Sequence, residues 1–142
     1  MKKVSFWPRA AVEKMEPPEN SVLISVFDRS DGPLARYHPK WVEVLQLRFH
    51  DTDGSQLGLE LCQLEHATQI FDLLARHPDC HEVVVHCAQG KSRSAAIALY
   101  LGESRNVPCL QQDKKVARPY FFANGRVTAC LCDADPENTF LS

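Results

Sequence analysis

The residues with the clearest potential for chemistry form one short stretch in the second half of the chain. It reads His86-Cys87-Ala88-Gln89-Gly90-Lys91-Ser92-Arg93-Ser94, so five residues separate Cys87 from Arg93. The β-branched run Val83–Val85 precedes it, and the apolar run Ala95–Leu101 follows it. We therefore expect a loop that leaves a buried strand and opens a helix.

A loop in this position is suited to binding an anion. Its backbone N–H groups surround the anion, and the helix N-terminus adds roughly half a positive charge. The same field favours a thiolate, so we expect Cys87 to have a pKa of roughly 3.5–7.5 instead of about 8.5. The planar guanidinium of Arg93 can bind two phosphate oxygens. Gly90 permits a positive φ or a close approach of the backbone to the ligand.

The stretch resembles the signature of the cysteine-dependent protein tyrosine phosphatases, and its H-C-x-x-G-x-S-R-S pattern is most similar to the dual-specificity branch. Val22–Val26, the Pro-containing loop after it and Trp41 are similar to the N-terminal half of small bacterial and phage members. The segment from Arg118 to Asn124 resembles the late R-P…P-N segment, with alanine at the usual proline position. The resemblance covers most of the chain.

The resemblance implies a protein tyrosine phosphatase that works in two steps, and it leaves dual specificity open. Cys87 attacks phosphorus and forms a phosphocysteine, which water then hydrolyses. Ser94 donates a hydrogen bond that helps the thiolate leave. The phosphate oxygens are held by Arg93 and by the loop amides, which belong to Ala88, Gln89, Gly90, Lys91, Ser92 and Arg93. The resemblance implies no metal and no other cofactor, and the expected partner is a phosphorylated protein or peptide.

Two aspartates are candidates for the general acid that protonates the leaving oxygen. Asp51 and Asp53 both follow the second predicted strand. Asp51 lies at the F-x-D position of the resembling family, so we prefer it, and Asp53 stays the alternative. His86 has two open interpretations, which are support of the thiolate and loop by hydrogen bonding and a purely structural histidine.

Other functions remain open from the sequence. The loop could serve an enzyme that acts on non-protein phosphates, such as phosphoinositides or RNA 5′-phosphates, or an inactive phospho-binding module. Sulfurtransferases and arsenate reductases also use a cysteine in an anion loop, but the S-R-S ending and the position of the loop in the chain do not suit them. The Gly90-Lys91-Ser92 sequence lacks the upstream glycine of a nucleotide-binding loop, because Val85 stands there.

The composition indicates one domain of ordinary globular character. The chain has 142 residues with a net charge of −2, from 16 basic and 18 acidic residues, so we expect neither a nucleic-acid binder nor a membrane protein. The start of the chain lacks the apolar run of a secretory signal. We expect the six cysteines to be reduced in the cytoplasm. The phosphatase domain is expected at 1–132 and a polar tail at 133–142, and the oligomeric state is not predicted.

Alternating patterns predict an α/β fold with a central, mainly parallel sheet of four or five strands flanked by helices. The predicted strands are Val22–Val26, Trp41–Phe49, whose second half alternates, and Glu82–His86. The predicted helices are a short one from Pro8 to Met15, an amphipathic one from Leu57 to Ala75, a buried one from Ala95 to Leu101, and two weaker ones between Asn106 and Leu131.

Overall fold

The computed structural model describes residues 1–52, 54, 58–116 and 120–138. These residues form six strands and four helices. The strands are β1 (Lys3–Pro8), β2 (Ser21–Phe27), β3 (Glu43–Arg48), β4 (Glu82–Cys87), β5 (Cys109–Gln111) and β6 (Lys114–Lys115). The helices are α1 (Arg9–Lys14), α2 (Leu64–Arg76), α3 (Arg93–Arg105) and α4 (Gly125–Ala134).

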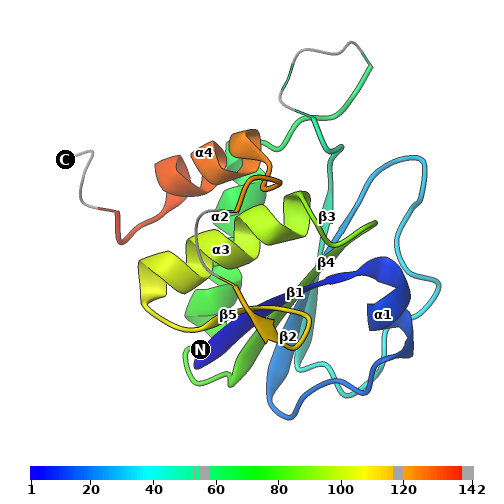
Figure 1. The fold of residues 1–142 in the computed structure, drawn as a ribbon, viewed down its shortest axis with the longest axis vertical. Helices are drawn as coiled ribbons and strands as arrows, with labels where there is room; N and C mark the ends of the chain where they lie inside the picture. The colour runs from blue at the N-terminus through cyan, green and yellow to red at the C-terminus, as the bar shows by residue number, and fades with distance from the viewer. Residues whose placement is uncertain (53, 55–57, 117–119, 139–142) are drawn as a thin grey trace.

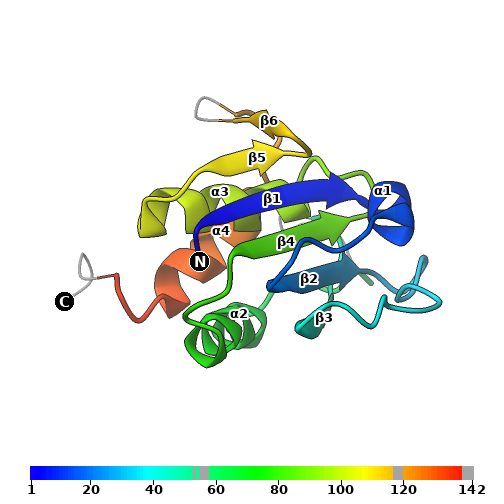
Figure 2. The ribbon, with the colours of Figure 1, turned by 90° about the horizontal axis from the view of Figure 1, so that it is seen from below.

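The strands form one mixed sheet in the order β3-β2-β4-β1-β5-β6, with β4 near its centre (Figure 2). The pairs from β3 to β5 are parallel, and only the β5–β6 hairpin is antiparallel. All six residues of β4 are buried, as expected for a strand covered on both faces. The α/β class and the mainly parallel sheet are therefore confirmed, although the sheet has six strands instead of four or five.

Helices cover both faces of the sheet (Figures 1 and 2). The residues of α2, α3 and α4 pack in one core with alternate residues of the central strands, such as Ile24 and Val85. On the opposite face, Leu23 and Val84 pack with Val12 of α1 and with Trp41. Because successive side chains of a strand point to opposite faces, each central strand contributes to both cores.

The strand β1 was not predicted, although its buried residues Val4 and Phe6 alternate with period two. The prediction of the first of the two weaker helices is also wrong, because residues 109–115 form the β5–β6 hairpin. Its turn contains Gln112, whose φ of 56° lies in the left-handed region. The strands β5 and β6 have three and two residues, which are too few for a hydrophobic period to be read from the sequence.

Two predicted helix boundaries need correction. The amphipathic helix begins at Leu64 instead of near residue 57, because Gln63 and His66 form reciprocal side-chain hydrogen bonds that cap its N-terminus; Leu57 itself lies outside the described residues. The buried helix runs through Gly102 to Arg105 and ends at Asn106 in the left-handed conformation. Gly102 is needed inside it, since an added Cβ would lie 3.0 Å from the Cβ of Cys109.

The C-terminal helix α4 ends near the expected tail. Asp135, directly after this helix, is buried and accepts hydrogen bonds from Tyr100 (2.7 Å) and Arg105 (2.9 Å). The chain is thus attached to α3 beyond residue 132. None of the helices in the described part of the chain combines the length and the apolar character needed to cross a bilayer.

Candidate functional site

The loop 88–92 joins the end of β4 to the start of α3, as the sequence predicted. It packs against the junction of β1 and α1, where the N–H of Arg9 donates to the carbonyl of Ala88 (3.2 Å). Gly90 has a φ of +68°, and an added Cβ would lie 2.3 Å from the backbone nitrogen of Pro8. The close backbone approach at Gly90 is therefore made to the β1–α1 junction. Only glycine satisfies both conditions.

Cys87 is the last residue of β4, and its side chain is buried at the base of the loop. Its Sγ lies 3.1 Å from the Oγ of Ser94 in the first turn of α3. Burial opposes ionisation, but hydrogen bonds from the Ser94 side chain and backbone, the Arg93 charge and the Gly90 amide together lower the pKa of Cys87. The thiol thus has the environment of a stabilised thiolate.

Arg93 is the first residue of α3, and it is only 4% exposed. Its Nη1 donates to the carbonyl of Phe49 (2.8 Å) and lies 3.5 Å from the carboxylate of Asp28. Within the described residues, Arg93 Nε is a buried nitrogen without a hydrogen-bond partner. Because buried donors are nearly always satisfied, this free donor beside Cys87 indicates a place for an anionic ligand.

The helix N-terminus at the loop has no side-chain cap. Ser92 occupies the N-cap position of α3, but its side chain makes no capping hydrogen bond. The Ser92 side chain therefore does not compete with a bound anion for the N–H groups of the first turn. Of the other loop residues, Ala88, Gln89 and Lys91 are exposed to solvent.

Asp51 reaches the loop from the segment after β3. Its Oδ1 accepts hydrogen bonds from Ser92 Oγ (2.7 Å) and Asn124 Nδ2 (2.7 Å). The loop that carries Asp51 is closed at its base, because His50 and Glu60 make two hydrogen bonds with each other (2.7 and 2.8 Å). The alternative acid, Asp53, lies outside the described residues.

His86 is almost completely buried, and it is neutral at pH 7. Burial, together with the charges of Arg9 and Arg93, lowers its pKa to about 4, although the Cys87 backbone acts in the opposite direction. Its Nε2 lies 2.6 Å from Ser25 Oγ, which in turn lies 2.9 Å from the Tyr37 hydroxyl. His86 is therefore held by β2 and the loop after it.

Sequence reasoning did not select three further residues that contact the site. Asp28, directly after β2, pairs with Arg93. Tyr120 donates to the carbonyl of Lys91 (3.0 Å), and Asn124 bonds to Asp51. A polar residue immediately after a buried strand was an available signal for Asp28. Tyr120 and Asn124 come from a region whose contacts with the loop are not visible in local patterns.

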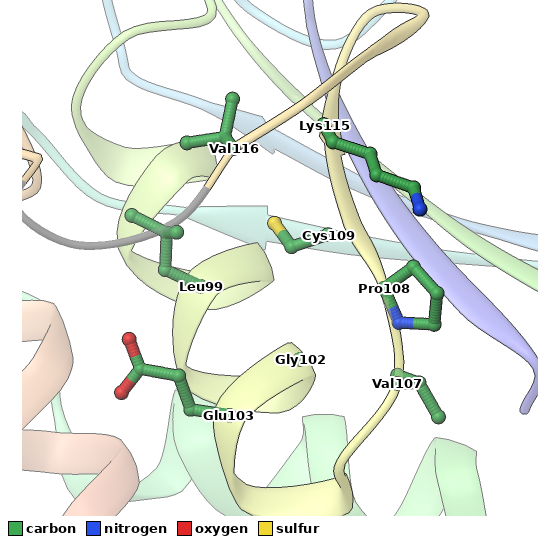
Figure 3. A pocket seen from close by; sticks show the side chains of 8 residues that line it. All are labelled: Leu99, Gly102, Glu103, Val107, Pro108, Cys109, Lys115 and Val116. Carbon is green, nitrogen blue, oxygen red and sulfur yellow. The ribbon is translucent and has the colours of Figure 1, made fainter.

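The described residues also enclose a cavity that lies away from the loop 88–92. A cavity of about 400 Å³ lies between the C-terminal half of α3 and the β5–β6 hairpin (Figure 3). It is lined by Leu99, Gly102, Cys109 and Val116, among others, and no residue of the loop 88–92 lines it. Within the described residues, no group of three or more His, Cys, Asp or Glu side chains is placed to hold a metal ion.

The chain matches no protein-family model, and no match was found among curated proteins or solved structures. The geometry of the loop and its surroundings therefore carries the functional argument.

Proposed function

We propose that the protein is a phosphatase of the cysteine-dependent type, which hydrolyses phosphomonoesters of protein tyrosine through a phosphocysteine intermediate. The observation that carries this proposal is the pairing of a buried, pKa-lowered thiol at the end of a strand with a buried arginine that retains a free donor. Both residues belong to one strand–loop–helix unit. Phosphotyrosine is the preferred substrate class, and phosphoserine or phosphothreonine would be secondary.

In the first step, the Cys87 thiolate attacks phosphorus, an S–P bond forms and the P–O bond to the phenol breaks. Asp51 transfers its proton to the departing oxygen. In the second step, a water molecule gives its proton to Asp51 and attacks phosphorus, which releases phosphate and the thiolate. Ser94, 3.1 Å from the sulfur, stabilises the thiolate as it leaves. Arg93 and the loop amides stabilise the charge on the phosphate oxygens throughout.

The arrangement supports this assignment over a phospho-binding module without activity. A binding module needs only the amides and the cation, whereas here the thiol also receives hydrogen bonds that favour its ionised form. The carboxyl group of Asp51 lies in hydrogen-bond contact with the same loop. The proposed nucleophile and anion clamp belong to one segment, and the proposed proton donor, distant in sequence, contacts the loop of that segment.

The test compares hydrolysis of para-nitrophenyl phosphate by the wild-type protein and by the Cys87→Ser and Arg93→Lys variants. We expect Cys87→Ser to abolish turnover while it retains vanadate binding, and Arg93→Lys to lose both, because lysine lacks the planar fork. The wild-type protein should release phosphate from phosphotyrosine peptides faster than from matched phosphothreonine peptides. Equal turnover by wild type and Cys87→Ser would refute the proposal.

The proposed setting is the cytoplasm. All six cysteines of the chain are free thiols, which agrees with a reducing compartment. The reaction as proposed uses only groups of the protein and water, so no cofactor is required. The proposed partner is a phosphorylated protein or peptide.

A further inference from the structure

Asn124 lies at the point where three segments of the candidate site meet. Its backbone N–H donates to the carbonyl of Ser92 (3.1 Å), which belongs to the loop between β4 and α3. Its Nδ2 donates to Asp51 Oδ1 (2.7 Å) and to the carbonyl of Thr52 (3.2 Å). Its Oδ1 accepts from the N–H of Val127 (3.1 Å) in the first turn of α4.

These contacts use both hydrogens and the oxygen of the Asn124 side-chain amide. An amide nitrogen carries two hydrogens, and here one is directed to Asp51 and one to Thr52. The amide oxygen alone performs the helix capping. Serine and aspartate cap a helix as well as asparagine does, but the aspartate carboxylate has no donor, and serine has one hydroxyl hydrogen in place of two amide hydrogens. Capping therefore does not require asparagine at position 124, whereas simultaneous donation to Asp51 and Thr52 requires an amide.

The carboxyl group of Asp51 depends on such contacts, because the residue is exposed and lies in a loop. Its Oδ1 accepts from both Ser92 and Asn124, and these two donors leave the second carboxyl oxygen, Oδ2, as the one to carry a proton. We propose that Asn124 is a positioning residue that fixes Asp51 against the anion loop, so that its proton reaches the leaving oxygen. This inference rests on the proposed phosphatase function.

The test uses Asn124→Ser, which keeps the cap of α4 and removes the amide donors without adding a charge. Its kcat/KM is measured with phenyl phosphate, whose phenolate leaving group requires protonation, and with para-nitrophenyl phosphate, whose leaving group is stabilised without it. We expect a loss of about 10- to 100-fold on phenyl phosphate, the scale of a misplaced catalytic group. On para-nitrophenyl phosphate we expect a loss of less than about threefold.

Two further variants separate positioning from a structural effect. Asn124→Ser should add little to Asp51→Asn, because the clamp has no function once the acid is absent. Gly125→Ala, next in the chain and with nothing within 4 Å of its added Cβ, is the matched control and should keep wild-type rates on both substrates. Thermal unfolding of Asn124→Ser should remain close to that of wild type.

The possible results distinguish failure of the positioning role of Asn124 from failure of the proposed phosphatase function. Equal losses on the two substrates, or an additive loss in the Asp51→Asn background, would show that Asn124 has only a structural function. If the wild-type protein hydrolyses the substrates in a Cys87-dependent way but Asn124→Ser shows no leaving-group effect, the positioning role is overturned and the proposed function stays intact. Absence of Cys87-dependent hydrolysis in the wild-type protein would overturn both proposals.

Discussion

Cys87 illustrates at the residue scale how hydrogen bonds can outweigh burial. Removal of a thiol from water disfavours its charged form, and burial, together with the negative charge of Glu103, raises the pKa of Cys109 to about 12. Cys87 is also buried, yet its pKa is lowered, because Ser94, the Gly90 amide and Arg93 all favour the thiolate. The difference between the two cysteines comes from the helix N-terminus and the loop, and this difference defines the reactive thiol.

The contribution of Ser94 can be measured through the reactivity of Cys87. Ser94→Ala removes the largest of the contributions that lower the pKa of Cys87, so the pH at which half of Cys87 is ionised should rise. The readout is the pH dependence of alkylation of Cys87 by iodoacetate, assigned by peptide mass spectrometry. Ser104→Ala, a control in the same helix, should leave the profile unchanged. An unshifted profile in Ser94→Ala would disprove the assigned cause.

Asp51 is the proposed general acid. Asp51→Asn keeps the size of the side chain and removes this proposed proton donor, so kcat/KM on a phosphotyrosine peptide should fall by roughly 10²–10⁴-fold. Asp53→Asn, two residues further along the chain, is the control and should retain wild-type activity. Loss of activity in Asp53→Asn together with normal activity in Asp51→Asn would assign the acid to Asp53.

At the scale of elements, the loop 88–92 depends on its packing against the β1–α1 junction. Gly90→Ala would force a Cβ to within 2.3 Å of the Pro8 nitrogen at a positive φ. We expect a destabilisation of about 1–3 kcal/mol from strain and overpacking, with loss of vanadate binding as the loop moves. Urea unfolding and calorimetry measure the two effects. Gly125→Ala is the control, and a Gly90→Ala variant with wild-type vanadate affinity would contradict the packing argument.

The elements also show which parts of the site the sequence could predict. Cys87, Arg93 and Ser94 lie in one continuous segment, so their strand–loop–helix context was readable from local patterns. The contact of Asn124 with Asp51 joins residues 73 positions apart, and nothing local encodes it. The missed strand β1 has only two alternating apolar residues, Val4 and Phe6, as a local signal, and its pairing with β4 and β5 is long-range.

At the scale of the molecule, the parallel sheet brings the site together. The carboxyl ends of parallel strands lie at one edge, and the segments after β1, β2, β3 and β4 all contribute contacts there. These contacts come from Arg9, Asp28, Asp51 and Cys87. The sequence predicted an α/β fold, but the strand order that selects these four segments depends on long-range pairing.

The buried His86 links the centre of this sheet to the stability of the whole protein. Its pKa is about 4 in the folded state and about 6.5 in an unfolded chain, so between these values the unfolded state binds the proton more strongly. The free energy of unfolding should therefore fall as the pH decreases through this range, and His86 should account for about 1.5 kcal/mol between pH 6.5 and pH 5.

Urea unfolding at several pH values measures this decrease in the free energy of unfolding. His86→Asn should make the decrease between pH 6.5 and pH 5 smaller by that amount, even if the variant is also less stable than wild type at pH 7. His81→Asn, which replaces an exposed histidine just before β4, should keep the wild-type pH dependence. An identical slope in His86→Asn would mean that this histidine is not the group held neutral by the sheet.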